Sequence, residues 1–130
     1  MKQYLLDTVT LVRHFSGKGY IGAKASAILN ADSQADNQFC ISVITLMEVM
    51  YLAERNRIEI NFQESLRRIN ESAMYLVVNL GVDILRVAEN MAVRELHDRL
   101  ILPTAKWLDV PVLSSDAEFS EIPGIHLIWI

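Results

Sequence analysis

The chain has 130 residues, of which 52% are hydrophobic and 22% charged, and its 12 Lys and Arg against 16 Asp and Glu give a formal net charge of −4. This composition is too apolar for a disordered protein, and 5 Gly and 3 Pro exclude a collagen-like repeat. The negative charge argues against a protein that coats nucleic acid non-specifically, because such binding depends mainly on Lys and Arg.

Five short apolar runs predict β-strands, at residues 4–6, 39–43, 75–78, 110–113 and 125–130. Between them we expect helices at residues 22–30, 44–53 and 99–108, an amphipathic helix that starts at Asn61 and runs into the third strand, and a helix over 84–95 with Asp83 as its N-cap. This alternation predicts one α/β domain over residues 1–130, a three-layer α/β/α sandwich with a mainly parallel central sheet.

The sequence offers no sign of export or of a membrane span. Asp7 interrupts the first apolar run before a signal-peptide core could form, and Glu48 breaks the apolar stretch 41–53. The single Cys40 lies inside an apolar run and has no partner for an intramolecular disulfide. We therefore expect a cytoplasmic protein with no membrane partner.

Four acidic residues stand close to predicted strand ends. Asp7 follows the first strand and Asp116 the fourth, Glu48 lies about one helical turn after the second, and Asp98 opens the helix over 99–108. Ligands of parallel α/β sheets bind at the carboxyl ends of the strands. Clustered carboxylates without a basic partner repel each other unless a cation intervenes, and carboxylate oxygens suit Mg²⁺ or Mn²⁺. Such a site favours phosphoryl chemistry.

Each acid also has a purely structural interpretation. The segment Thr45 to Glu48 matches a capping box, in which Glu48 would close the start of a helix. Asp98 would serve as an N-cap, and Asp7 and Asp116 as turn residues. These roles and a metal-binding role can coexist.

Four segments in chain order resemble PIN-domain proteins, in particular the VapC-type toxins of bacterial toxin–antitoxin pairs. They are Tyr4-Leu5-Leu6-Asp7-Thr8, Ile41-Ser42-Val43-Ile44-Thr45-Leu46-Met47-Glu48-Val49, His97-Asp98-Arg99-Leu100-Ile101-Leu102-Pro103-Thr104-Ala105 and Val112-Leu113-Ser114-Ser115-Asp116.

The resemblance implies a PIN fold and a Mg²⁺- or Mn²⁺-dependent endoribonuclease that acts as a toxin. Its catalytic and metal-binding residues would be Asp7, Glu48, Asp98 and Asp116, and Ser114 matches the hydroxyl residue that the family often carries before its last acid. Thr8 would be a second supporting hydroxyl. The implied partners are an RNA substrate, a cognate antitoxin and a second copy of the chain in a homodimer.

Two departures and two rival functions remain open. Pro103 falls where the family usually has a small helix former, so either the helix kinks there or Asp98 precedes the helix by a few residues. Ser114-Ser115 replaces a more usual Thr followed by a variable residue. The alternatives are a PIN-fold protein-binding module, docking through apolar helix faces at 44–53 and 66–78, and a PIN nuclease that is not a toxin. Candidate contacts to an RNA backbone are Arg13, Lys18, Arg94, Arg99 and Lys106.

Overall fold

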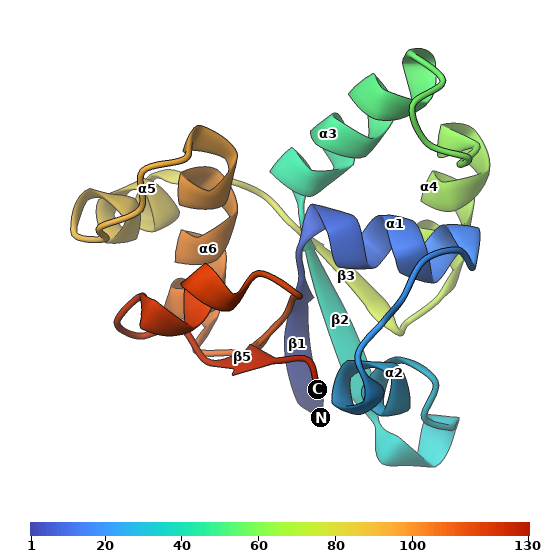
Figure 1. Ribbon diagram of the computed structural model, residues 1–130, viewed down its shortest axis with the longest axis horizontal. Coiled ribbons are helices and arrows are strands. Elements are labelled where there is room, and N and C mark those ends of the chain that lie inside the picture. Colours follow the sequence, from blue (N-terminus) through green and yellow to red (C-terminus); the bar gives the residue numbers. More distant parts are fainter.

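A five-stranded parallel sheet of order β3-β2-β1-β4-β5 forms the centre of the protein, as a computed structural model of residues 1–130 shows (Figure 1). All four strand pairs are parallel, and Leu5 of β1 is paired with Cys40 of β2 and with Val112 of β4. The strands are β1 (Lys2–Leu6), β2 (Asn37–Ser42), β3 (Tyr75–Val78), β4 (Val112–Leu113) and β5 (Leu127–Ile128).

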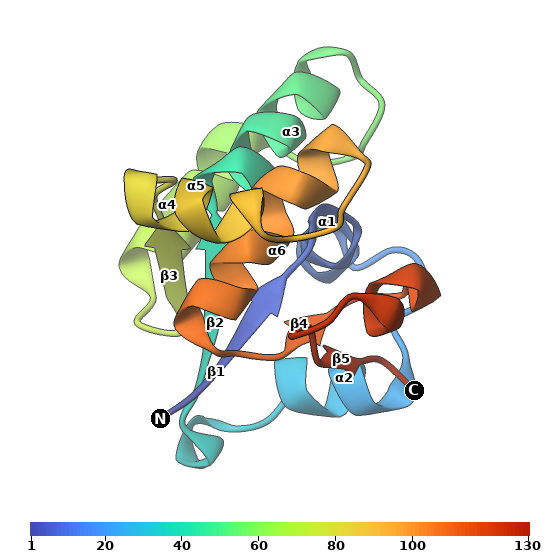
Figure 2. The same ribbon diagram turned by 90° about the vertical axis from the view of Figure 1, so that its left-hand side faces the viewer.

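Six α-helices and two short 3-10 helices connect the strands and cover both faces of the sheet (Figures 1 and 2). Helices α1 to α4 pack against one face, and α5 and α6, which lie toward the viewer in Figure 2, cover the other. The predicted three-layer α/β/α sandwich is therefore confirmed. The helices are α1 (Thr8–Ser16), α2 (Ala23–Leu29), η1 (Ser33–Ala35), α3 (Val43–Glu54), α4 (Phe62–Glu71), α5 (Val82–Glu89), α6 (Leu96–Leu108) and η2 (Ala117–Glu121).

Alternate residues of each strand enter two separate hydrophobic cores. Leu6, Phe39 and Ile41 pack under α1 to α4, whereas Leu5 and Cys40 pack under α6. Successive side chains of a strand point to opposite faces, so both faces of a buried strand must be apolar. This explains why the strands read as continuous apolar runs.

Several predicted boundaries are wrong. The helix expected over 84–95 begins at Val82, with Gly81 rather than Asp83 as its N-cap, and it ends at Glu89, with Asn90 as its C-cap. The chain then turns inward, because Met91 and Val93 are buried in the core beside α6. The expected last strand over 125–130 is reduced to Leu127–Ile128.

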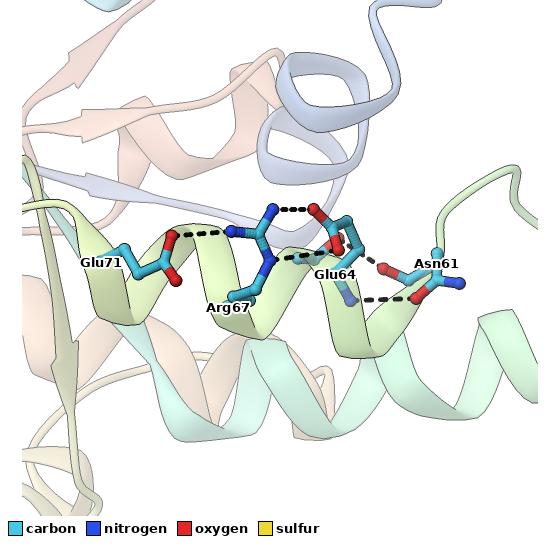
Figure 3. A network of polar contacts seen from close by, with 5 residues as sticks. Asn61, Glu64, Arg67 and Glu71 are labelled. Atoms are coloured by element: carbon cyan, nitrogen blue, oxygen red, sulfur yellow. Dashed lines mark hydrogen bonds and ion pairs between the residues drawn. The ribbon is translucent and has the colours of Figure 1, made fainter.

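Helix α4 shows how its exposed face is stabilised. The Asn61 side chain accepts a hydrogen bond from the Glu64 backbone amide, and Arg67 pairs with both Glu64 and Glu71 (Figure 3). Exposed pairs of this spacing contribute only a few tenths of a kcal/mol each. Their main consequence is that the charge of Arg67 is already compensated within the helix.

No helix of the structure combines the length and the apolarity that crossing a membrane would require.

Candidate active site

The four predicted acids lie together. They line one cleft of about 470 Å³, although they come from the start of α1, the second turn of α3, the first turn of α6 and the start of η2. The cleft is lined by Asp7, Thr8, Val9, Glu48, Glu95, His97, Asp98, Ile101, Leu102, Ser115, Asp116 and Phe119. No Lys or Arg lines it, so its five carboxylates face one another without a permanent cation.

Asp7 is held on both carboxylate oxygens. It is the N-cap of α1, where its Oδ1 accepts a hydrogen bond from the Thr10 backbone amide at 2.9 Å. Its Oδ2 accepts a short hydrogen bond from the Ser114 hydroxyl. Strand β1 therefore places Asp7 at the carboxyl edge of the sheet, and hydrogen bonds from α1 and from Ser114, directly after β4, fix its orientation. The structural and the functional interpretation of Asp7 coexist at one residue.

Glu48 does not lie at the start of its helix, as the surrounding sequence suggests. The capping-box interpretation is wrong, because α3 begins directly after β2 and its N-cap is Ser42, whose Oγ accepts from the Ile44 amide at 3.1 Å. Thr45 is thus buried in the first turn, with its hydroxyl unpaired. Glu48 lies one turn further on, and its Oε1 accepts a hydrogen bond from the Thr8 hydroxyl at 3.0 Å.

Asp98 lies within the first turn of α6 and is not its N-cap. That role belongs to Glu95, whose Oε2 accepts a hydrogen bond from the Asp98 amide at 2.7 Å. The helix continues through Pro103, which is buried in its interior. Asp98 therefore belongs to the helix, and the alternative in which it precedes the helix by a few residues is wrong.

Asp116 is the N-cap of η2, and its Oδ1 accepts from the Glu118 amide at 3.0 Å. Its own amide donates to the Ser114 hydroxyl at 3.1 Å. Because that hydroxyl also donates to Asp7, the fully buried Ser114 links two acids that lie far apart in the sequence. The predicted supporting residues, Ser114 and Thr8, thus each contact a carboxylate of the cleft.

Two lining residues were missed or undervalued from the sequence. Glu95 was not predicted as a cap, because glutamate is not among the preferred N-cap residues. His97 has no partner nearby in the sequence pattern, yet its Nδ1 lies 3.3 Å from Glu95 and 4.0 Å from Glu48. Their spacing before Asp98, at the predicted start of a helix, is the only signal that could have found them.

The proximity of the acids shifts the pKa values of two of them. The pKa of Asp98 is raised from 3.8 to about 6, first by partial burial and then by the negative charges of Glu95, Asp116, Asp7 and Glu48. The pKa of Glu95 is lowered, chiefly because its carboxylate accepts the Asp98 amide. Negative charge is thus favoured on Glu95 and disfavoured on Asp98, and a cation beside Asp98 would offset the repulsion from the neighbouring carboxylates.

The donor set of the cleft fits a hard divalent cation. Mg²⁺ usually keeps several waters and binds proteins through one or two carboxylates. No three of the acidic, histidine or cysteine side chains converge closely enough to surround an ion. A Mg²⁺ ion held by one or two of these carboxylates would complete its coordination with water, and its charge would relieve the repulsion among the acids.

The Ser114 hydroxyl gives a first testable prediction. In Ser114→Ala we expect a loss of about 1–3 kcal/mol in the free energy of unfolding, because the buried hydroxyl that satisfies Asp7 and the Asp116 amide is gone. Urea denaturation measures the loss. Ser115→Ala, at an exposed neighbour, is the control and should unfold like the wild type. Equal midpoints for the two variants would contradict a structural role of Ser114.

Comparison with known proteins agrees with this architecture. The family model of the PIN domain matches residues 4–125. No curated protein sequence matches the chain significantly.

Three solved structures share the fold over nearly the whole chain. A chain of VapBC2 from Rickettsia felis, bound to a DNA fragment from its promoter, is 16% identical with a TM-score of 0.73 and coverage of 98% of this chain and 99% of that one. A chain of DNA-bound VapBC from Salmonella typhimurium is 22% identical, with a TM-score of 0.67 and coverage of 98% of this chain and 98% of that one. A chain of a toxin–antitoxin complex from Klebsiella pneumoniae is 24% identical, with a TM-score of 0.62 and coverage of 96% of this chain and 95% of that one. Since the family model covers nearly all of the sequence and the fold agrees, the chain belongs to the PIN-domain family.

Proposed function

We propose that the chain is a metal-dependent endoribonuclease that hydrolyses phosphodiester bonds of RNA. The observation that carries the proposal is the convergence of Asp7, Glu48, Asp98 and Asp116 on one cleft without Lys or Arg. PIN domains are generally nucleases, which supports the same reaction class. The catalytic and metal-binding residues would be these four acids.

A Mg²⁺ or Mn²⁺ ion bound there would supply Lewis-acid chemistry, through which the scissile phosphate is polarised and a water activated. Asp7 and Asp116 would hold it from the sheet edge, in orientations that Ser114 sets. Asp98 would hold it from α6. Glu48, kept in place by Thr8, would orient the attacking water.

The hydrolysis would proceed by in-line attack of water on phosphorus. The hydroxyl of the water adds to phosphorus, the bond from phosphorus to the 3′ oxygen breaks, and the proton passes to that oxygen. The products are a 5′-phosphate and a 3′-hydroxyl. The protein contributes mainly by positioning and by charge, as is usual in phosphoryl transfer.

The test is cleavage of a mixed-sequence single-stranded RNA by purified protein in Mg²⁺, in Mn²⁺ and in EDTA. We expect cleavage with either metal and none in EDTA. The end groups of the products check the direction of bond cleavage. Intact RNA under all three conditions would refute a nuclease, and cleavage that persists in EDTA would refute the metal requirement.

A toxin role, with a cognate antitoxin as partner and with pairing of two copies, belongs to the same proposal. Three structures that share the fold come from toxin–antitoxin complexes, which supports it. The antitoxin would offer an Arg or Lys to the cleft, because a cation there would replace the charge of the metal. Expression of the chain alone in bacteria should arrest growth, and expression of Asp7→Asn should not. Equal growth would argue for a nuclease that is not a toxin.

The rival function as a protein-binding module has less support. Most of the apolar residues on the two helix faces in question are packed in the core, among them Leu46, Val49 and Ile69. Only Met47 and Tyr51 of α3 remain largely exposed.

A further inference from the structure

A second polar cavity lies further along α1 from the acidic cleft and has the opposite charge. It has a volume of about 400 Å³ and lies between the C-terminal half of α1 and the segment that follows α3. Three cationic side chains line it, from Arg13, Lys18 and Arg57, and its single carboxylate is Glu59. In a chain with a net charge of −4, this local excess of positive charge needs an explanation.

The positive charges in this basic pocket are only partly compensated. Lys18 pairs with Glu59, which ties the loop after α1 to the loop after α3. Arg13 donates to the backbone carbonyl of Tyr20 at 2.8 Å, a neutral acceptor that leaves its charge intact. The exposed Arg57 makes no side-chain hydrogen bond or ion pair within the chain. Two cations thus remain without a counter-charge.

Arg13 is held in place by its surroundings. A Cβ at Gly19, which has a φ of +90°, would approach the Arg13 side chain to 2.9 Å, so the loop packs directly across that side chain. The guanidinium is fixed at its other end by the Tyr20 carbonyl. An arginine whose position is set in this way loses less conformational entropy when it binds an anion.

Both α1 and α3 connect the pocket to the acidic cleft. Thr8 and Val9 of α1 line the cleft, and Val12, Arg13 and Ser16, on the same side of that helix, line the pocket. The rise of a helix places Arg13 roughly 8 Å beyond Thr8 along the axis, so a single strand a few nucleotides long can extend from the cleft to the pocket.

Helix α3, like α1, has an acidic residue of the cleft near its start and basic residues near its end. Helical spacing puts Glu48, Tyr51 and Arg55 on one side of α3, and Arg55 lies over the Tyr51 ring at 3.5 Å from its centroid. Arg57 follows at the end of the helix. The cations are thus absent from the cleft itself and gathered at the C-terminal ends of α1 and α3, the helices that have Asp7 as N-cap and Glu48 in the second turn.

We infer that the basic pocket binds a backbone phosphate of the single strand that flanks the scissile bond. This inference rests on the proposed nuclease function and adds a second contact region for the substrate. Complementary charge is what selects the occupant, because a phosphodiester strand carries one negative charge per nucleotide and the pocket has two uncompensated cations. The cleft holds the reacting phosphate through a metal, and the pocket holds a neighbouring phosphate directly.

The test measures binding of a fluorescein-labelled single-stranded RNA of mixed sequence by fluorescence anisotropy over a range of salt concentrations. The experiment uses EDTA and an Asp98→Asn background, so that binding is observed without cleavage. Arg57→Gln is the informative variant because Arg57 is exposed and has no intramolecular partner. Arg86→Gln is the matched control, an exposed arginine on α5 across the sheet. Arg57→Lys keeps the charge.

For Arg57→Gln we expect the slope of log affinity against log salt to fall by about 0.7, the value for one phosphate contact to a single strand. At about 0.1 M salt this corresponds to roughly fivefold weaker binding. Arg57→Lys should bind nearly as the wild type does, and Arg86→Gln should match it. Arg57→Gln and Arg86→Gln with the same slope would overturn the inference.

Two further arms separate this inference from its alternatives. A polyglutamate peptide of equal charge tests whether the pocket serves an acidic protein segment. Displacement of RNA by that peptide at equal concentration, with the same dependence on Arg57, would overturn the phosphate assignment. If the wild type cleaves no RNA with Mg²⁺ or Mn²⁺ but the Arg57 effect on RNA binding holds, the pocket stands and the proposed nuclease function fails.

Discussion

Asp7→Asn is expected to lower the rate of RNA cleavage by roughly 10³-fold, because loss of one metal-binding carboxylate removes several kcal/mol of transition-state stabilisation. The substitution should leave the fold intact. Asparagine keeps an oxygen that can accept the Thr10 amide as the N-cap of α1, and its amide group can still contact the Ser114 hydroxyl. Only the charge is lost. Single-turnover cleavage in Mn²⁺ measures the effect.

The matched control is Asp32→Asn. Asp32 is also an aspartate N-cap, and its side chain accepts from the Gln34 amide at the start of η1, outside the acidic cleft. Thermal unfolding should show similar midpoints for both variants, and only Asp7→Asn should lose activity. An Asp7→Asn protein that cleaves RNA at the wild-type rate would remove Asp7 from the active site.

Asp98→Asn is expected to stabilise the protein at neutral pH in EDTA while abolishing cleavage. The pKa of Asp98 is about 6 in the folded protein, against 3.8 for the ordinary group. Between these values the folded state binds more protons than the unfolded state, so stability falls as pH rises from about 4 to about 6. Asparagine removes this cost. Since Asp98 is partly exposed and screened by solvent, we expect a gain of only a few degrees in Tm.

The measurement is Tm against pH for both proteins, in EDTA and in Mn²⁺. The difference should be small near pH 4 and reach its full size above pH 6. The lowered pKa of Glu95 acts in the opposite sense, and subtraction of the two curves isolates Asp98. Mn²⁺ should raise the Tm of the wild type more than that of the variant, because a ligand stabilises the state that binds it. A pH-independent difference in Tm would mean that the titration of Asp98 is not its cause.

The location of the site was predictable because apolar runs mark where strands end. Asp7 directly follows β1, Asp116 follows β4 after Ser114 and Ser115, and parallel strands present their carboxyl ends at one edge. The order of the strands in the sheet was not predicted. Two-residue strands such as β4 and β5 are defined by their pairing with neighbours, which no local pattern encodes.

Helix boundaries near the site were less predictable, because several residues can serve as caps. At α3, Thr45 and Glu48 match a capping box, but the chain leaves β2 directly into the helix and Ser42 takes the role. At α6, Glu95 caps the helix although Asp98 has the preferred residue type. In both places the tertiary path of the chain decides which residue caps.

The central position of β1 ties the packing of the protein to its chemistry. Leu5 and Leu6 are both fully buried, in different cores, and Asp7 follows them directly. Insertion or deletion of one residue in β1 would exchange the two leucines between the cores and displace Asp7 by about 3.3 Å along the strand. Changes of length at this strand are thus far less tolerable than substitutions, and natural variants of the chain should keep its register even where they change its residues.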